Sequence, residues 1–128
     1  MGRVGAPELR AYVVWLPVLE ADDEAAARAS AGRLRDPRVR HYWDGTRAFG
    51  LALGSALAIP PPRVERGRSR GLAWDVYLVY PPASTWDATI PTPGFWMHQL
   101  HQVPPEQAPE FEPRAFQAQV EAALRAPH

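Results

Sequence analysis

Imidazole and carboxylate side chains gather in two short segments of the sequence. His41 and Asp44 lie three positions apart, and so do His98 and His101. Two imidazoles with a carboxylate are a common ligand set for zinc, manganese, nickel or iron. One hypothesis is therefore a divalent-metal site built from these four residues. The competing hypothesis is structural: His98 packs with neighbouring aromatic rings and donates to a backbone carbonyl, while His101 is solvated.

A further carboxylate, Asp75, interrupts the longest run of β-branched and aromatic residues, Ala73 to Tyr80. A buried carboxylate has to be paired or hydrogen-bonded, because isolated burial of its charge is costly. We expect a structural role in which Asp75 accepts from an Arg, Trp or Tyr donor. The alternative is a general acid/base pair of Asp75 with a histidine, and Asp75 and His41 are then the catalytic candidates.

Composition excludes several other chemistries. The sequence has no cysteine, so it can form no disulfide, thiolate metal site or dithiol redox motif. Its 14 basic and 14 acidic residues give a net charge of zero, which argues against a general nucleic-acid or acidic-membrane binder. All the basic residues are arginine, a bias typical of GC-rich bacterial genomes. The sequence starts without an apolar leader, and none of its apolar runs approaches the roughly 20 residues of a membrane span. We therefore expect a soluble cytoplasmic protein.

Apolar patterning and cap residues predict the elements that position these side chains. The first strand is apolar throughout, which favours burial on both faces, and the strand that contains Asp75 has the composition of the centre of a sheet. Gly50 and Gly54 would either let a helix approach the sheet closely or weaken that helix. The expected elements are strand 11–18, helix 22–34 with Asp22 as N-cap, strand 38–44 with alternating residues, helix 46–58 capped by the turn Asp44-Gly45-Thr46, an exposed loop at 59–71 and strand 73–80.

The second half of the sequence contains one clear helix. Phe116, Val120 and Leu124 form an apolar stripe at helical spacing after Pro113. Pro81-Pro82 predicts a turn after strand 73–80, and the segment 85–88 is expected to return antiparallel beside that strand. Periodicity cannot settle the structure of 95–101. The predicted organisation is a flexible arm at 1–10, one domain at 11–101, a Pro/Glu-rich linker at 102–112 and a C-terminal helix packed on the domain at 113–126.

The order of these elements predicts an α/β domain. A right-handed crossover makes the first two strands parallel, and a hairpin at the side completes a mixed four-stranded sheet with helices on both faces. Four stretches resemble a cysteine-less thioredoxin-like family of small uncharacterised bacterial proteins: Tyr12 to Pro17, Arg38 to Asp44, Ala73 to Tyr80 and Phe95 to Leu100. The resemblance covers roughly residues 11–100, and it implies a thioredoxin-like fold and no particular activity.

The sequence departs from working thioredoxins at the redox motif. Leu16 to Glu20 occupies the place where those enzymes carry Cys-x-x-Cys, and Gly71-Leu72 replaces the proline before the third strand. Thiol–disulfide oxidoreductase activity is therefore excluded for this chain.

Aromatic residues suggest a binding surface instead. Trp86, Phe95, Trp96 and Met97 lie where the hairpin meets irregular chain, and an exposed patch there would suit a protein partner or a homodimer. The leading prediction is a non-catalytic interaction or accessory protein without a cofactor. The alternative is a divalent-metal-binding protein or metal-dependent enzyme.

Overall fold

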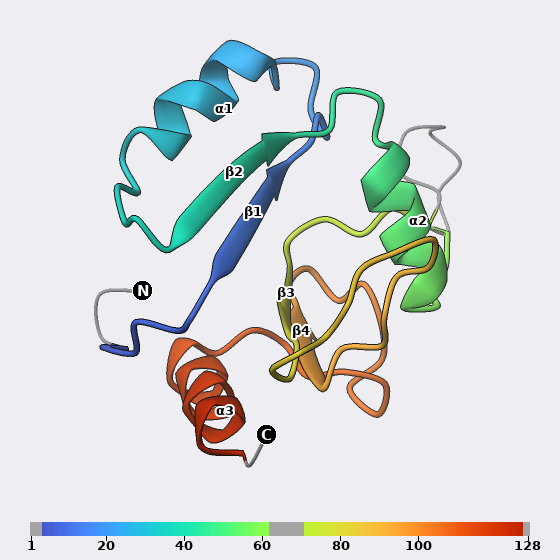
Figure 1. Cartoon of the computed structure of the whole chain (residues 1–128). Coiled ribbons are helices and arrows are strands. Elements are labelled where there is room, and N and C mark those ends of the chain that lie inside the picture. The colour runs from blue at the N-terminus through green and yellow to red at the C-terminus, as the bar shows by residue number, and fades with distance from the viewer. Residues whose placement is uncertain (1–3, 62–70, 127–128) are drawn as a thin grey trace.

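The chain forms a small α/β domain in a computed structural model that describes residues 4–61 and 71–126 (Figure 1). Its elements are β1 (Ala11–Trp15), α1 (Glu24–Ala31), β2 (Val39–Trp43), α2 (Ala48–Ala56), β3 (Val76–Val79), β4 (Phe95–His98) and α3 (Pro113–Arg125). The α/β class is confirmed, but the single mixed four-stranded sheet is wrong. Within the described residues, β1 and β2 form one parallel pair, and β3 and β4 form a separate antiparallel pair. Most of the loop expected at 59–71 lies outside the described residues.

Strand β2 alternates as its sequence predicts. Val39 is buried and Arg40 is exposed, and Val13 of β1 lies opposite His41. The helix α1 lies beside β2 and covers the sheet face that carries Trp15, His41 and Trp43. The expectation that strand 11–18 is buried on both faces is wrong, because no helix among the described residues packs on the opposite face.

Asp23, one residue after the predicted cap, is the N-cap of α1. Its side chain accepts from the Ala26 N–H at 2.7 Å. Asp22 instead accepts from the backbone N–H groups of Val18 and Leu19 at 2.9 and 2.7 Å, and these bonds lower the pKa of its carboxyl. Its carboxylate thus orders the turn that joins β1 to the helix.

The expected central strand is shorter than its composition suggests. Asp75 has a φ of 50°, a left-handed conformation that ends the extended backbone, so β3 begins at Val76. The partner of β3 is β4 rather than the segment 85–88, with Leu78 opposite Trp96. The prolines at 81 and 82 do turn the chain, but a long loop follows before the chain returns. A turn signal alone does not fix where the next strand begins.

Two glycines allow α2 to lie against the chain that leads into β3. The Ala73 N–H donates to the Gly50 carbonyl oxygen at 3.0 Å, and a Cβ on Gly54 would overlap the carbonyl oxygen of Gly71. Of the two alternatives for these glycines, the close approach is found, but it is to the chain that leads into β3 rather than to a strand of the sheet.

The core lies between α2, β3, β4 and the irregular segment that follows β4. Val103 and Ala108, from the stretch expected as a linker, are buried in it with Leu53 and Leu57. The Gln107 side chain donates to the Leu57 carbonyl at 2.8 Å and fastens this segment to the end of α2.

The predicted C-terminal helix is confirmed as α3. Its N-cap, Glu112, accepts from the N–H groups of Arg114 and Ala115 at 3.0 and 2.7 Å. Phe116 meets the ring of Tyr77 edge-on at 5.9 Å, and Phe111 stacks on that ring at 3.9 Å. These aromatic contacts hold α3 against β3.

Candidate functional site

Two of the predicted metal ligands meet at a glutamate that lies in the expected linker. Glu110 Oε1 is 2.9 Å from His101 Nδ1 and 3.4 Å from His98 Nδ1, and it also accepts from the His101 backbone N–H at 2.8 Å. The buried ring of His98 donates from Nε2 to the Ala108 carbonyl at 3.0 Å, while 91% of the His101 side chain is exposed. These positions match the structural hypothesis for both histidines.

The other two predicted ligands lie elsewhere and already have partners. Asp44 Oδ2 accepts from the Gly50 N–H at 3.0 Å at the start of α2. His41 lies beneath α1, where its Nδ1 accepts from the Trp15 indole N–H at 3.2 Å. Among residues 4–61 and 71–126, no group of three or more His, Asp or Glu side chains could hold a metal ion. The four predicted ligands are therefore not brought together.

The catalytic candidates, Asp75 and His41, also do not form a site. Asp75 is exposed, and its backbone carbonyl accepts from the Gln99 N–H at 3.1 Å. The expectation that its carboxylate is buried is wrong, because the left-handed backbone at this position turns the residue out of the strand. Burial of the phenol, and secondarily the negative charge of Asp75, raise the pKa of Tyr77 above its ordinary value.

His41 is unsuited to act as a general base in this conformation. Its Nδ1 lone pair is engaged by Trp15, so the neutral ring carries its proton on Nε2, which faces the Leu34 carbonyl at 3.5 Å. A cavity of about 150 Å³ lies beside the ring, between α1 and the sheet. That volume is below the roughly 300 Å³ at which ligand pockets begin.

The aromatic residues predicted as a partner-binding patch have different exposures. Met97 is buried in the core, Phe95 and Trp96 are half-buried, and Trp86 is 48% exposed. Trp86 meets the ring of Tyr80 edge-on at 4.9 Å. Of the four, Trp86 is the one that presents a large apolar surface.

A more exposed aromatic pair lies on the uncovered face of β1 and β2. Tyr12 and Tyr42 are 65% and 54% exposed, and their rings stack at a centroid distance of 6.4 Å. Sequence reasoning missed this pair because strand 11–18 is apolar enough to be buried on both faces, so Tyr12 was expected to be covered. The signal was present in β2, where Tyr42 alternates with His41 and Trp43 and shares its face with Arg40.

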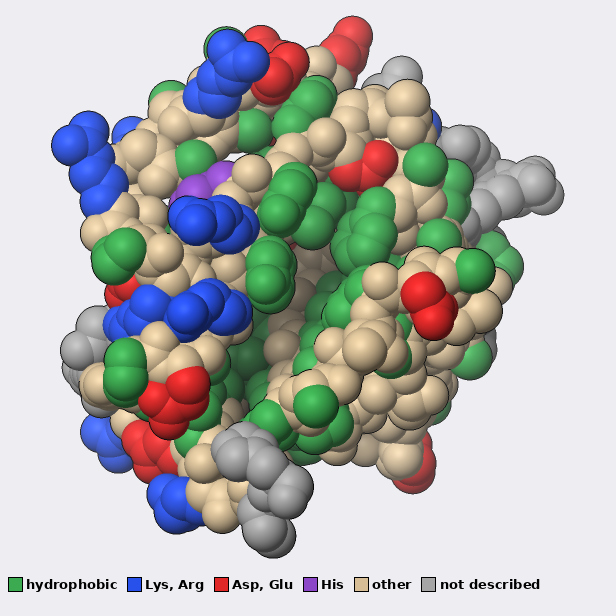
Figure 2. Space-filling view, in the orientation of Figure 1, with side chains coloured by type: hydrophobic (Ala, Val, Ile, Leu, Met, Phe, Trp, Pro, Cys, Tyr) green, Lys and Arg blue, Asp and Glu red, His purple; other side chains and the backbone are tan. Residues whose placement is uncertain are grey.

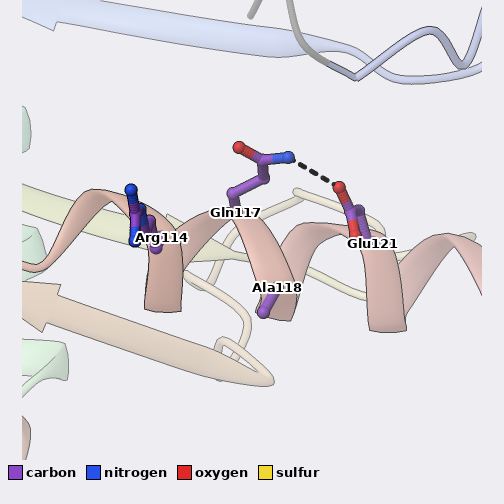
Figure 3. A pocket seen from close by; sticks show the side chains of 4 residues that line it. All are labelled: Arg114, Gln117, Ala118 and Glu121. Carbon is purple, nitrogen blue, oxygen red and sulfur yellow. Dashed lines mark hydrogen bonds between the residues drawn. The ribbon is translucent and has the colours of Figure 1, made fainter.

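A hollow lies between the two halves of the domain. Figure 2 shows it at the centre of one face, with hydrophobic side chains on its walls and arginines gathered on the side of β1 and β2. β3, β4 and α2 lie on its other side (Figures 1 and 2). A depression of about 290 Å³ adjoins α3, and Figure 3 shows Arg114, Gln117 and Glu121 on the same side of that helix. Gln117 donates to Glu121 at 2.8 Å, so these polar groups are partly satisfied by each other.

Comparison of the chain with protein-family models, with curated proteins and with solved structures gave no match in any of the three. Among the residues that the structure describes, no helix has both the length and the apolar composition needed to cross a lipid bilayer.

Proposed function

We propose that this chain is a non-catalytic interaction module that serves as an accessory protein in the bacterial cytoplasm. The observation that carries the proposal is the uncovered face of the β1–β2 pair, on which Tyr12 and Tyr42 stack in solvent. We name the exposed side chains Tyr12, Arg40 and Tyr42 the tyrosine face. A protein partner would cover this face.

The energetics of parallel sheets support this assignment. Parallel strands normally have both faces covered, and an isolated pair of strands is only marginally stable in water. Here α1 covers one face of β1 and β2, while the rings of Tyr12 and Tyr42 remain mostly in solvent. Burying a large apolar side chain contributes about 1.5–3 kcal/mol. Covering the two tyrosines would therefore supply a useful share of the binding free energy of a complex.

The arrangement of the polar residues supports a non-catalytic role. Asp44 binds the first turn of α2, His41 binds Trp15, and His98 binds the Ala108 carbonyl. Each of these groups has a structural partner in the fold. An active site instead needs its acid, base or nucleophile converging on one accessible pocket.

We further propose that the domain is a thioredoxin-like variant. Its strand and helix order supports this, and so does the parallel β1–α1–β2 unit that precedes an antiparallel pair. Since β1 and β3 are not paired with each other, the domain would be a variant in which the four-stranded sheet of that fold is divided into two pairs. The thioredoxin-like scaffold would then be kept for binding, without its dithiol.

Selection of ligands from a random peptide library displayed on phage tests the interaction role. Peptides enriched on the wild-type chain should lose at least about tenfold in affinity on a Tyr12→Ser/Tyr42→Ser variant, or about 1.4 kcal/mol. The matched control is Leu19→Ser, which removes a side chain that is 70% exposed and lies outside the sheet.

Circular dichroism and urea unfolding of each variant would show whether it keeps its fold. Peptides that bind the double variant as tightly as the wild type would place the binding surface elsewhere. A library that yields no ligand for the wild-type chain would contradict the proposed role of the tyrosine face.

A further inference from the structure

Two strand edges border the hollow, and both are free within the described residues. β1 is paired with β2 on one side only, and β3 is paired with β4 on one side only. Figure 1 shows the β1–β2 pair and the β3–β4 pair apart from each other, and in the same orientation Figure 2 shows the hollow between them. β1 and β3 are not paired with each other. A free strand edge carries a row of unpaired backbone N–H and C=O groups, which is a template for another strand.

The hydrogen-bond pattern identifies the free groups on β1. The Ala11 N–H donates to the Arg38 carbonyl at 2.9 Å, and the Asp44 N–H donates to the Trp15 carbonyl at 2.7 Å. Residues 11, 13 and 15 therefore direct their backbone groups toward β2. Since the direction alternates along a strand, Tyr12 and Val14 direct theirs outward.

The same reasoning applies to β3. The Gln99 N–H donates to the Asp75 carbonyl at 3.1 Å, so positions 75, 77 and 79 face β4 in this antiparallel register. His98, opposite Val76, directs its N–H and carbonyl away from β3, to Pro109 and Phe111 at 3.2 and 2.7 Å. Val76 and Leu78 thus present their N–H and C=O groups on the free edge of β3.

From this geometry we infer that the hollow receives one extended, uncharged segment of a partner protein, which adds as a strand between β1 and β3. The inference rests on the proposed function and names its kind of partner. Addition of a strand to a free sheet edge is a common mode of peptide recognition, in which main-chain bonds give affinity. The inserted strand would turn the two pairs of strands into one sheet.

The composition of the edges defines the chemistry of this segment. β1 reads Ala-Tyr-Val-Val-Trp and β3 reads Val-Tyr-Leu-Val, with no charged residue in either. Unpartnered edges normally carry charges or prolines that prevent association, and these two lack both. Together with the hydrophobic walls in Figure 2, the uncharged edges suit a segment rich in β-branched residues.

A second copy of this chain fits the hollow less well. A strand that enters between β1 and β3 needs both of its own edges free. In another copy of the chain, one edge of β1 is already paired with β2, and one edge of β3 is already paired with β4. Neither strand could therefore pair on both of its sides. The occupant is therefore a segment that is not part of a sheet before it binds.

A synthetic peptide with alternating valine and threonine, seven residues long and blocked at both ends, provides the probe. Hydrogen exchange of individual amides is measured by NMR with and without it. In the free protein, the amides of Tyr12, Val14, Val76 and Leu78 should exchange rapidly, while those of Val13 and Tyr77 are protected. Saturating peptide should slow exchange of the four edge amides by at least about tenfold.

One protein variant and one modified peptide sharpen the test. Val14→Pro removes an outward N–H while leaving the bonds of residues 13 and 15 to β2, and it should weaken peptide binding by about tenfold or more. A peptide that is N-methylated at alternate residues loses the donors of one edge and should bind equally poorly. Thermal unfolding of Val14→Pro verifies that the domain is folded.

Several results would overturn the inference. If the edge amides are already protected from exchange in the free protein, β1 and β3 pair directly with each other. If that protection grows with protein concentration, copies of the chain associate through these edges instead. Peptide binding that depends on Tyr12 and Tyr42 without protecting the edge amides would leave the proposed function intact and refute strand insertion. If library ligands of the tyrosine face exist but the strand peptide does not bind, strand insertion is likewise refuted.

Discussion

His98 shows how a side chain suited to catalysis is used to hold the fold together. It is 1% exposed, and its Nε2 donates to the Ala108 carbonyl in the segment that follows β4. Its Nδ1 faces Glu110 from the same segment at 3.4 Å. The ring therefore fastens an irregular stretch of chain, which buries Val103 and Ala108 in the core, to the edge of β4.

Replacing His98 by Leu should lower the free energy of unfolding by about 1–3 kcal/mol, because it leaves the buried Ala108 carbonyl without its donor. The exposed neighbour His101 provides the control, and His101→Ala should change stability by less than about 0.5 kcal/mol. Urea denaturation followed by tryptophan fluorescence measures both. Equal losses in the two variants would contradict the structural role assigned to His98.

Asp36 gives the fold a predictable dependence on pH. Its carboxylate accepts from the Arg38 guanidinium at 2.6 and 2.9 Å, and Arg38 also donates to the carbonyls of Val4 and Ala6. The hydrogen bond from Arg38 lowers the pKa of Asp36 to about 2 from an ordinary 3.8. A lowered pKa means that the ion pair stabilises the folded state above pH 3.8 and that this contribution is lost as the pH falls toward 2.

We therefore expect the difference in unfolding free energy between wild type and Asp36→Asn to be constant near neutral pH and to shrink as the pH falls below the ordinary pKa of an aspartate. Urea unfolding at a series of pH values measures it. In an Arg38→Gln background the same substitution should have a smaller effect, because only the hydrogen bond from the backbone N–H of residue 38 to the carboxylate remains. A difference that grows on acidification would refute the assignment.

The roles of individual residues were predictable where their partners are close in sequence or in register. The structural hypothesis for His98 followed from the aromatic residues beside it. Asp44 was expected in the turn that caps the second helix, and its carboxylate does accept from the Gly50 N–H in the first turn of α2, although the N-cap position is Arg47. Glu110 was not predictable as the partner of His98 and His101. An irregular segment brings it back to β4, and no sequence pattern fixes that path.

At the scale of elements, the contact between α2 and the chain that enters β3 depends on glycine. The Cβ of an alanine at position 54 would overlap the Gly71 carbonyl oxygen, which belongs to the backbone and cannot move aside easily. A Cβ at position 50 would lie 2.7 Å from Leu72 Cδ1, the end of a flexible side chain. The two sites are matched in helix, residue type and burial.

Gly54→Ala should therefore cost about 1–3 kcal/mol or more from overpacking, although alanine favours a helix by up to about 1 kcal/mol over glycine. Gly50→Ala should be closer to neutral, because Leu72 can change rotamer. Thermal and urea unfolding of both variants compare them. A Gly54→Ala protein at least as stable as the wild type would show that α2 does not lie against Gly71.

Elements with strong local signals were predicted well, and the pairing of strands was not. The apolar stripe of Phe116, Val120 and Leu124 gave α3 correctly, and alternation gave β2. β4 is a run of four residues without a clear period, so its structure stayed undecided. The wrong hairpin partner, 85–88, followed from treating the prolines at 81 and 82 as a tight turn, whereas the chain continues through a long loop before Phe95.

At the scale of the whole molecule, the separation of the sheet into two pairs is the largest departure from expectation. Local patterns predict strands, but which edges finally pair depends on contacts distant in sequence. The uncharged edges of β1 and β3 explain why one sheet was expected, since either strand could lie at the centre of a sheet. The hollow between them is the feature from which binding of a strand was inferred.

The absence of cysteine from the sequence makes this separation directly testable. A Val14→Cys/Leu78→Cys variant places one thiol on each of the two strands that border the hollow, at residues whose backbone groups face the free edges. A disulfide requires Cα atoms within about 7 Å, a distance reached between paired strands. Because β1 and β3 are not paired, we expect the variant to remain reduced under mild oxidation.

Tyr12→Cys/Arg40→Cys is the matched control, since these residues are register partners across β1 and β2 and both are exposed. This pair should form its disulfide readily, as measured by thiol titration and the mobility of the unreduced chain. If Val14→Cys/Leu78→Cys oxidises as readily as the control, β1 and β3 meet in solution, and the protein closes into the single sheet that its sequence predicts. If it stays reduced, and the strand peptide leaves both thiols less reactive toward a labelling reagent, the hollow is open in the free protein and is the place where the peptide binds.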